Sequence, residues 1–429
     1  MSFTFQDAEE YLNSLLVFGI KLGLQNMQVL NSCLNDPASK LQFIHVAGTN
    51  GKGSTCAFLA AATKAAGLKT GFYSSPFLVS FFERWRINGA PVQEEAYLKA
   101  IQQVIAVESE VKNQTGVRPT YFEVLTAVAL LIFLEQDCDI VIWETGMGGR
   151  LDATNIVDPL LTIITNISED HGAYLGDTLL EVAGEKAGII KAGIPLVCGE
   201  TKPEIKSFFA ARAAELQCEA FFIDEDFSIS QNDGDSLCFQ AELEQIDYSI
   251  SLLGEHQRSN SALALKTLQL LQETGMIREI PLHAFNATAW PGRLQKLSDG
   301  IILDGAHNPA AMNELVKYLK KSKPNEKWSI ISGMMHDKDI SATLRLLQPI
   351  CEHFYAVPIN IPRAIKTDEL CTLAEELLDC ETTECTSWQE ALELSQGNGN
   401  KLIVGSLYLA GEVLGKLAPA SALNTDTLS

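Results

Sequence analysis

The sequence lacks several features that would place it in a common class. Its ten cysteines include no Cys-X-X-Cys pair, and the closest two in the sequence are Cys380 and Cys385. This argues against a zinc ribbon or a disulfide scaffold and favours a reducing, cytoplasmic setting. Low-complexity segments and evident internal repeats are also missing, so neither a disordered linker nor a repeat array is expected.

Basic residues are scarce. Lysine and arginine total 32 against 54 aspartates and glutamates, which gives a formal net charge of −22. A chain this acidic is not expected to bind nucleic acid or an anionic membrane in general. If it binds an anionic ligand, local basic side chains must do so; the candidates are Lys52, Arg84, Arg86, Arg150, Lys186 and Arg293.

Long apolar runs are absent as well. The longest, residues 124–134, is too short to span a bilayer, which takes about 20 residues. No signal peptide is expected at the acidic N-terminus. A hydrophobic content of 46% over 429 residues instead supports two or three packed domains. We expect residues 124–134 to form a buried helix that leads into a strand at residues 140–143.

The most informative segment that is present is a glycine-rich turn with a lysine, Gly48-Thr49-Asn50-Gly51-Lys52-Gly53-Ser54. It follows an apolar strand pattern at residues 43–46 and precedes a helical pattern that we expect over residues 56–66. Backbone N–H groups at the start of such a helix, the helix dipole and a lysine ammonium together bind phosphate. The segment therefore predicts a nucleoside triphosphate site.

This turn departs from the common phosphate-loop pattern at two positions. Val46 stands where the pattern has its first glycine, and Gly53 separates Lys52 from Ser54. The alternative is an ordinary glycine-rich turn with a solvated lysine. The strand before the turn and the helix after it favour the phosphate interpretation.

Strand and helix patterns alternate along the chain, which predicts an α/β fold with mostly parallel strands. A Trp290-Pro291-Gly292 break ends the first series, and a second series follows it. We expect an ATPase-like domain with the phosphate loop over residues 1–290 and a smaller, Rossmann-like doubly wound domain over residues 296–429. Catalysis is expected in the cleft between the two domains.

Chemistry-bearing residues follow several strands of the first series, where ligands of open α/β sheets gather. Glu144 ends a buried strand and is a candidate Mg2+ ligand beside a triphosphate, with helix capping as the alternative. Ser75 is a weaker candidate for a second oxygen ligand. His171 lies in a polar loop, where hydrogen bonding is the more common role. Lys186, which has apolar neighbours, is a further candidate site residue, with an ordinary surface lysine as the alternative.

In the second series, Asp304 and His307 lie in a strand-to-helix turn that would face the nucleotide from the far side. Arg293 would balance phosphate charge. A turn rich in glycine, asparagine and proline needs no ligand to explain it, so both interpretations stay open.

These motifs occur together and in order. Besides residues 48–54 they are Ser-Ser-Pro at 74–76, Thr-Tyr-Phe-Glu at 120–123, Glu-Thr-Gly-Met-Gly-Gly-Arg-Leu-Asp-Ala-Thr-Asn at 144–155, Asp-His at 170–171, Glu-Lys-Ala-Gly-Ile-Ile at 185–190, Trp-Pro-Gly-Arg at 290–293 and Leu-Asp-Gly-Ala-His-Asn-Pro at 303–309. The ordered set covers nearly the whole chain. It resembles bacterial folylpolyglutamate synthase, including its bifunctional dihydrofolate synthase form, within the Mur ligase superfamily.

The resemblance implies ATP-dependent amide ligation by a cytoplasmic, monomeric enzyme. The carboxylate of a pterin substrate, 7,8-dihydropteroate or a tetrahydrofolate, attacks the γ-phosphate of ATP and becomes an acyl phosphate. The amino group of L-glutamate then displaces phosphate. The resemblance also implies two Mg2+ ions and a CO2-derived carbamate on a lysine. Positioning and charge neutralisation are the main tasks of the protein in such a reaction.

The resemblance further assigns residues to roles. Lys52, Lys186 and His171 form the catalytic set. Ser75, Glu144 and His171 match the Mg2+ ligands, and the carbamate of Lys186 suits a second Mg2+. The ATP contacts are Thr49, Asn50, Gly51, Lys52, Gly53, Ser54, Asn260, Arg293, Asp304 and His307. The pterin pocket is matched by Gly19, Ile20, Lys21, Leu22, Thr120, Phe122, Leu151, Asp152 and Ala153, with Phe122 stacking on the pterin ring.

Lys21 departs from the bifunctional pattern, because an acidic residue is expected at its position. One alternative is therefore a synthase that only extends polyglutamate. A second is a cell-wall Mur ligase, which usually has Thr directly after the loop lysine and an additional N-terminal domain. A third is a nucleotide-binding switch without ligase activity, which a second nucleotide-facing domain disfavours. The sequence leaves the number of added glutamates, the preferred one-carbon folate form and any monovalent cation requirement open.

Overall fold

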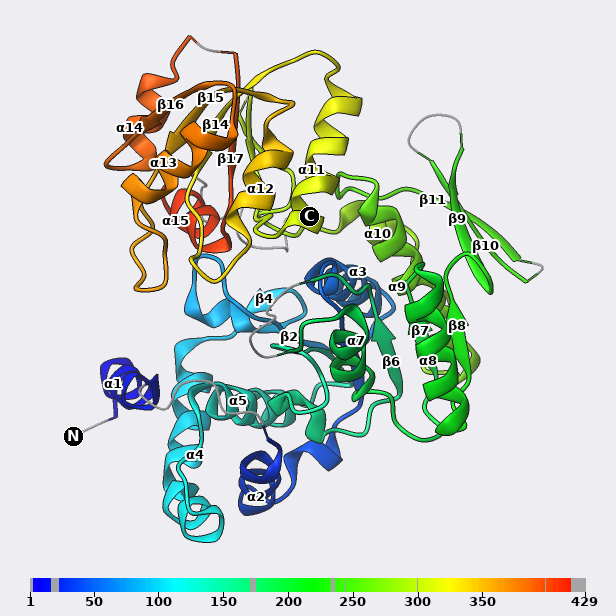
Figure 1. Ribbon diagram of the computed structural model, residues 1–429. Helices are drawn as coiled ribbons and strands as arrows, with labels where there is room; N and C mark the ends of the chain where they lie inside the picture. The colour runs from blue at the N-terminus through cyan, green and yellow to red at the C-terminus, as the bar shows by residue number, and fades with distance from the viewer. Residues whose placement is uncertain are drawn as a thin grey trace.

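The computed structural model describes residues 3–16, 23–169, 175–232, 236–242, 244–298, 300–397 and 399–417. The chain forms a larger lobe from its N-terminal part and a smaller lobe from its C-terminal part (Figure 1). A small sheet, β9 to β11, projects from the larger lobe. The expected α/β class is confirmed, since each lobe is built on its own sheet with helices around it.

An eight-stranded sheet forms the centre of the larger lobe, in the order β4-β3-β2-β5-β1-β6-β7-β8. In this order, the six strands β2, β5, β1, β6, β7 and β8 pair in parallel, whereas β3 pairs antiparallel with both β2 and β4. Every residue of the central strands is buried, because helices cover both faces of a parallel sheet. The strands are β1 Phe43–Ala47, β2 Thr70–Tyr73, β3 Trp85–Ile87, β4 Ala90–Pro91, β5 Ile140–Glu144, β6 Leu161–Ile164, β7 Leu196–Cys198 and β8 Ala220–Phe222.

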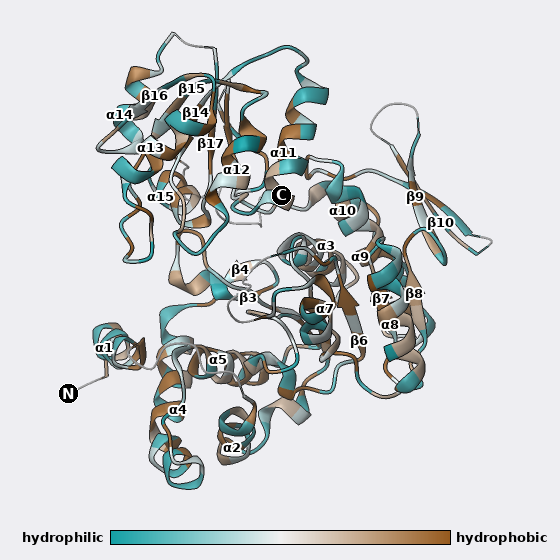
Figure 2. Cartoon of the chain, in the orientation of Figure 1, coloured by the Kyte–Doolittle hydropathy of each residue, from teal (hydrophilic) through white to brown (hydrophobic). Residues whose placement is uncertain are grey.

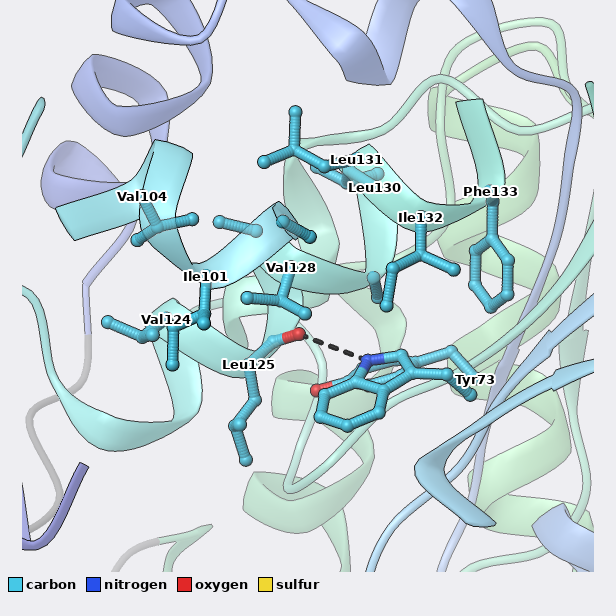
Figure 3. Close-up of a cluster of buried hydrophobic side chains, with 14 of the residues drawn as sticks. Tyr73, Ile101, Val104, Val124, Leu125, Val128, Leu130, Leu131, Ile132 and Phe133 are labelled. Carbon is cyan, nitrogen blue, oxygen red and sulfur yellow. Dashed lines mark hydrogen bonds between the residues drawn. The ribbon is translucent and has the colours of Figure 1, made fainter. Parts of the chain in front are cut away.

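Successive residues of these strands point into two separate cores. Phe43 and Trp143 face the core beneath α1, α2, α4 and α5, whereas Ile44 and Ile142 face the core beneath α3, α9 and α10. In the first core the Trp85 indole donates a hydrogen bond to the Leu125 carbonyl at 3.3 Å (Figure 3). The helices are α1 Phe5–Leu16, α2 Gln25–Cys33, α3 Lys52–Ala65, α4 Glu94–Thr115, α5 Tyr121–Glu135, α7 Leu179–Ala187, α8 Pro203–Glu215, α9 His256–Glu273 and α10 His283–Ala287.

Two helices around the sheet test the expectations from the sequence. Helix α5 contains the long apolar run and is buried along nearly its whole length, as expected. The expected start of the helix after the glycine-rich turn is wrong, because α3 begins at Lys52 rather than at residue 56. Gly51 caps this helix in a left-handed conformation, so Lys52 and Gly53 belong to its first turn. The phosphate loop is therefore shorter and more helical than the sequence indicated.

A six-stranded sheet forms the smaller lobe, in the order β12-β13-β17-β14-β15-β16. Its strands are parallel except for β12 at one edge. The strands are β12 Gln295–Ser298, β13 Ile301–Leu303, β14 Trp328–Ser332, β15 Cys351–Ala356, β16 Glu381–Glu384 and β17 Asn400–Val404. The helices are α11 Pro309–Ser322, α12 Ile340–Leu347, α13 Thr367–Leu377, α14 Trp388–Leu394 and α15 Leu407–Leu417.

A three-stranded antiparallel sheet, which the sequence did not predict, lies between β8 and α9 in the sequence. It consists of β9 Phe227–Gln231, β10 Leu237–Ala241 and β11 Glu244–Tyr248. Phe227 and Phe239 stack 5.8 Å apart and pack into the core beneath α9. Its outer face is polar, so apolar alternation is weak there and the pattern resembles a loop.

The two lobes share packing as well as a chain connection. Leu78 and Val79, in the loop after β2, pack against the core of the smaller lobe that includes α15. Figure 2 shows strand β6 in brown, the colour of hydrophobic residues. The outer helices have stretches in teal, the colour of hydrophilic residues. Among the helices that the structure describes, none has the length and hydropathy of a membrane span. The division at residues 290 and 296 stays a proposal.

Candidate active site between the lobes

A cavity of about 1080 Å3 lies between the lobes. The sequence-predicted site residues that the structure describes all line it, although they come from distant segments. Gly19, Ile20, Lys21, Leu22 and His171 lie outside the described residues. The lining residues predicted from the sequence are Thr49, Asn50, Gly51, Lys52, Gly53, Ser54, Ser75, Thr120, Phe122, Glu144, Leu151, Asp152, Ala153, Lys186, Asn260, Arg293, Asp304 and His307.

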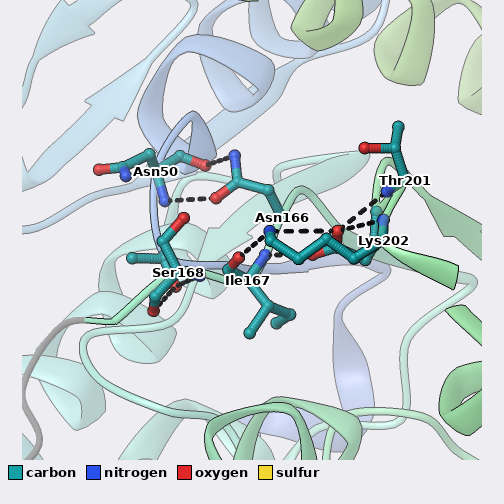
Figure 4. A network of polar contacts seen from close by, with 8 residues as sticks. Asn50, Asn166, Ile167, Ser168, Thr201 and Lys202 are labelled. Atoms are coloured by element: carbon teal, nitrogen blue, oxygen red, sulfur yellow. Dashed lines mark hydrogen bonds and ion pairs between the residues drawn. The ribbon is translucent and has the colours of Figure 1, made fainter. Parts of the chain in front are cut away.

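The phosphate loop is fixed by the segment that follows β6. The Asn50 N–H donates to the Asn166 side-chain oxygen at 3.0 Å, and the Asn166 amide donates back to the Asn50 carbonyl at 2.9 Å. Thr165 donates to the same carbonyl at 2.6 Å. The Ser168 N–H donates to the Thr49 hydroxyl at 3.0 Å (Figure 4). These bonds hold the loop in one shape.

The same network extends to β7. The Glu200 carboxylate is buried and accepts from the Ile167 N–H at 2.7 Å and from the Lys202 N–H at 2.8 Å. The Lys202 ammonium donates to the Ile167 carbonyl at 2.6 Å (Figure 4). The ends of β6 and β7 are thereby tied together behind the phosphate loop.

Lys52 is the first residue of α3, and its ammonium lies over the loop. It donates to the carbonyls of Gly48 at 3.0 Å and Thr49 at 3.2 Å. Gly51 must be glycine, because its φ is 85° and a Cβ atom there would lie 2.4 Å from the Asn260 side-chain oxygen. A helix N-terminus, a close backbone and a lysine therefore occupy one end of the cavity, as anion binding requires.

A chain of buried amides connects the phosphate loop to α9. The Gln257 amide donates to the Ser54 hydroxyl at 3.2 Å, and the Asn260 amide donates to the Gln257 side-chain oxygen at 2.9 Å. Gln257 was not assigned a role from the sequence. Its signal was its position one helical turn before Asn260, which puts both side chains on one face.

Glu144 ends β5 inside the cavity and is buried. Burial raises the pKa of its carboxyl to about 7, while the positive charges of Lys52 and Arg293 and a hydrogen bond from the Ser75 backbone act in the opposite direction. The helix-capping alternative is not what the structure shows for this residue. A further positive charge beside this carboxyl would favour its charged form.

The atoms around Glu144 fit a hard cation. Ser75, in the loop after β2, lines the same wall. The hydroxyl of Thr145, the residue after Glu144, is buried and has no hydrogen-bond partner among the described residues. Carboxylate and hydroxyl oxygens are what Mg2+ prefers, with phosphate oxygens completing its shell. Among the described residues, no three His, Cys, Asp or Glu side chains gather.

Lys186 lies in the last turn of α7, and only 3% of its surface is exposed. The surface interpretation of this lysine is therefore wrong. The glycine loop after β5 approaches the same turn, because the Arg150 N–H donates to the Glu185 carbonyl at 2.6 Å and the two side chains pair at 2.7 Å. This contact brings Lys186 to the cavity wall that also contains Glu144.

An aromatic wall forms the other end of the cavity. Phe122, in the first turn of α5, lies 6.2 Å from the Tyr73 ring. A Cβ atom on Gly146 would lie 2.4 Å from the Phe122 ring, so glycine is what lets the ring rest against this loop. Tyr121 and Met147 line the same wall and were not predicted. The wall offers a flat, apolar surface of the kind on which an aromatic ligand stacks.

Thr120 and Asp152 form hydrogen bonds that stabilise the local backbone. Thr120 caps α5, accepting from the Glu123 N–H at 3.3 Å. The Asp152 carboxylate accepts from the Met147 N–H at 2.7 Å and from Thr154 at 2.5 Å. Burial raises the pKa of Asp152 against these bonds. Both residues therefore shape the wall, whether or not they also touch a ligand.

Arg84 is a further cation in the cavity wall. It is 7% exposed, lies 5.1 Å from the Phe77 ring, and its Nε finds no acceptor among the described residues. It was one of the basic candidates from composition but had no assigned role. Two other candidates lie outside the cavity lining: Arg86 pairs with Glu83, and Arg150 pairs with Glu185.

The smaller lobe contributes the opposite wall. Asp304 accepts from the N–H groups of Leu294 and Ala306, each at 2.7 Å, so its carboxylate organises the turn that contains His307. The His307 Nδ1 donates to the Gly305 carbonyl at 2.8 Å. Asn308 caps α11 and donates to the Asn50 side chain at 3.1 Å. This bond crosses directly from the smaller lobe to the phosphate loop.

Other lining residues had weaker signals in the sequence or none. Asn166 directly follows β6, so the strand-end argument that found Glu144 would also have found it. Lys338, Arg363 and Tyr408 follow three strands of the smaller lobe. Arg363 donates to the Tyr408 hydroxyl at 2.9 Å across 45 residues of sequence, a contact that no local pattern reveals.

Comparisons with known proteins agree with this geometry. The Mur ligase middle domain matches residues 46–268, and the glutamate ligase domain of Mur ligases matches residues 292–406. The dihydrofolate synthase/folylpolyglutamate synthase of Bacillus subtilis is 36% identical, covering 96% of this chain and 99% of its own. The folylpolyglutamate synthase of Lacticaseibacillus casei is 35% identical, covering 89% and 91%. The structure of E. coli FolC in complex with DHPP and ADP has a TM-score of 0.85 at 30% identity, covering 95% and 96%.

Proposed function

The chain belongs to the Mur ligase family and is an ATP-dependent ligase, and we propose that it joins L-glutamate both to 7,8-dihydropteroate and to tetrahydrofolates. The Bacillus relative has both synthase names, whereas the Lacticaseibacillus relative has only the second. The observation that supports the proposal best is the composition of the cavity. One space contains the phosphate loop, the buried Glu144 and Lys186, and the aromatic wall at Phe122.

The proposed reaction has two steps in this cavity. An oxygen of the substrate carboxylate attacks the γ-phosphorus of ATP, and ADP leaves, which produces an acyl phosphate. The amino nitrogen of L-glutamate then attacks the acyl carbon, and inorganic phosphate leaves with the electron pair of the broken bond. The attacking neutral amine loses one proton to solvent and keeps the other as the amide N–H. Holding three reactants in line supplies much of the rate enhancement in such a reaction.

Three cationic side chains line the cavity and would interact with the negative charges of the reactants. Lys52 lies at the phosphate loop, and Arg293 enters from the smaller lobe close enough to lower the pKa of Glu144. Both would stabilise negative charge passing to the β-phosphate. We assign Arg84, in its aromatic surroundings, to the carboxylate of the pterin substrate. A buried guanidinium with an unfilled Nε suits a carboxylate oxygen.

We propose that Glu144 and Ser75, with His171, hold Mg2+, and that Lys186 as a carbamate holds a second Mg2+. Bound Mg2+ would neutralise phosphate charge and orient the γ-phosphate. The position of Lys186, buried and lining the same cavity as Glu144, supports this assignment, because a carbamate there would add a carboxylate-like anion to the site. The oxygen-rich surroundings of Glu144 support the first ion.

The test is L-glutamate-dependent ADP release from the purified protein with ATP and Mg2+, comparing 7,8-dihydropteroate with tetrahydrofolate. Turnover with both substrates is the expected result. Turnover with tetrahydrofolate alone would restrict the enzyme to polyglutamate synthesis and make Lys21 the first residue to exchange for an acid. Nucleotide binding without glutamate-dependent turnover on either substrate would overturn the proposal and favour a different amide ligase or a switch.

We also propose that one chain is sufficient for activity. The cavity takes its phosphate loop, its acidic and basic groups and both walls from a single chain. Sedimentation of the active protein at the mass of one chain, 46.8 kDa, is the expected result. Activity confined to a heavier species would contradict it.

A further inference from the structure

Two cysteines of the smaller lobe lie in contact far from the cavity. Cys351 is the first residue of β15, and Cys380 directly precedes β16. Their Sγ atoms are 2.9 Å apart. A disulfide bond is about 2.05 Å long, and non-bonded carbon atoms already rest about 3.5–4.0 Å apart. The two sulfurs are therefore closer than ordinary packing and need only a small movement to bond.

The backbone around the pair is held in place by sheet pairing. Strands β15 and β16 are parallel neighbours, with His353 opposite Glu381 and Tyr355 opposite Thr383. Cys351 and Cys380 lie just ahead of these pairs, on adjoining chains at the amino ends of both strands. In the sequence the two residues are 29 positions apart, and Cys385 is much nearer to Cys380. Only the strand pairing selects Cys351 as the partner.

The surroundings make one thiol the better nucleophile. Either sulfur can donate the hydrogen bond between the two thiols; when Cys351 donates, this bond and the positive charge of Lys327 nearby lower the pKa of Cys380 against the effect of burial. Cys351 is buried, and its pKa is raised by donating to Cys380 and by burial. Cys380 is partly exposed, so a small oxidant reaches it first.

We propose that Cys351 and Cys380 are a redox modification site that forms a reversible intramolecular disulfide with a small disulfide oxidant such as glutathione disulfide. The Cys380 thiolate attacks one sulfur of the oxidant, which forms a mixed disulfide and releases one glutathione thiolate. Cys351, losing its proton, then attacks the Cys380 sulfur and releases the second glutathione. Two electrons pass from the protein to the oxidant, and the two protein protons end on the two glutathione thiols.

The position of the bond decides its effect. Strand β16 is an edge of its sheet, and α13 connects it to the preceding segment. The cavity-lining residues of this lobe, such as Asp304 and Lys338, follow the carboxyl ends of the strands. The two cysteines lie at the amino ends, which is the opposite edge of the sheet. A link between the amino ends therefore fastens the edge strand and leaves the ligand-facing loops where they are. We expect a change in stability rather than in rate.

The experiment treats the reduced full-length protein with excess glutathione disulfide, quenches with acid and measures intact mass and linked peptides. The expected product has lost two hydrogens, about 2 Da, with one linked peptide pair joining Cys351 to Cys380. Its unfolding midpoint should rise by roughly 10 °C and return on reduction with dithiothreitol. Glutamate-dependent ADP release should change less than about twofold, since no residue of the cavity is linked.

Variants separate this site from general thiol oxidation. Cys351→Ser should stop at the mixed disulfide, with one glutathione on Cys380, whereas Cys33→Ser, which changes another partly exposed thiol, should still form the link. If Cys351→Ser does not fold, alkylation of the wild type gives the same answer, because the link protects Cys380 while Cys33 and Cys218 still react. Persistent glutathione on Cys380 of the wild type with Cys351 still reduced would overturn the proposal.

Discussion

The two ends of the cavity are built by different means. The nucleotide end uses the backbone: loop N–H groups, the start of α3 and a network in which Asn50 and Asn166 bond each other in both directions. The aromatic end, which we propose binds the pterin and call the pterin end, uses side chains from segments far apart, with Phe122 resting on Gly146 and Asp152 accepting from the Met147 N–H of the same loop. The first end is determined by a short local segment, and the second exists only after the sheet has formed.

This difference separates general chemistry from substrate choice. A phosphate loop serves any triphosphate reaction, because phosphate has the same shape and charge in each. The aromatic wall must fit one ring system, and small changes to it alter which ring binds. Substitutions at the two ends should therefore affect different kinetic constants.

Replacing Glu144 with Gln should give the largest loss and tests whether the nucleotide end depends on a charged ligand. The variant keeps the shape of the side chain but loses the charge that would hold Mg2+, so kcat should fall about 100- to 1,000-fold. Steady-state ADP release over a range of Mg2+ concentrations measures this. Wild-type rates at limiting Mg2+ would remove Glu144 from the ligand set.

The same carboxyl should make the ligand-free protein less stable as pH rises. Its pKa of about 7 in the folded state lies above the ordinary 4.5, so the folded state favours the protonated form. Stability is full below about pH 4.5 and is lost as pH rises through about 7, with about 3 kcal/mol at stake from this group. Urea unfolding of the wild type and Glu144→Gln between pH 5 and about pH 8 should show this slope only in the wild type.

Replacing Lys186 with Ala should lower activity about 100-fold if its carbamate holds a cation. Added acetate, which supplies a carboxylate in the vacated space, should restore part of the loss. Lys64→Ala, which changes an exposed lysine at the end of α3, is the matched control. Unchanged turnover in Lys186→Ala would refute the carbamate assignment.

Replacing Phe122 with Ala should sharpen the comparison, because it touches the pterin end alone. The loss of a stacking surface should raise the KM for the pterin substrate about tenfold and leave the KM for ATP unchanged. Phe122→Tyr keeps the ring and should stay near wild type. An equal rise in both KM values would mean that the two ends are not independent.

Replacing Asn308 with Asp should give the smallest effect, about threefold to tenfold on kcat/KM for ATP. Aspartate still accepts from the Ala311 N–H, which keeps the cap of α11, and from the Asn50 amide, but it has no amide to donate to the Asn50 side-chain oxygen. Thermal unfolding should therefore be unchanged in Asn308→Asp and lowered in Asn308→Ala. Equal activity in wild type and Asn308→Asp would show that the hydrogen bond donated by the Asn308 amide is dispensable.

Sequence patterns predicted the fold where burial is continuous. Strands β1 and β5 and helix α5 were expected within a few residues, because parallel strands and covered helices read as uninterrupted apolar runs. The small sheet β9 to β11 was missed, since its outer face is polar. The start of α3 was misplaced because a glycine in a left-handed conformation begins this helix in the middle of the turn.

Many of the residues that line the cavity could also be predicted from the sequence, because strand ends and glycine-rich turns are local features. The sequence by itself determined that a phosphate loop, a strand-end carboxylate and a second α/β unit exist in this chain. The tertiary structure alone decided that Lys186 is buried, that Arg84 enters the cavity, that Asn308 meets Asn50, and that Cys380 meets Cys351 rather than Cys385. The reason is physical: hydrophobic periodicity fixes which face of an element is covered, whereas pairings between distant segments depend on sheet order, which no local pattern encodes.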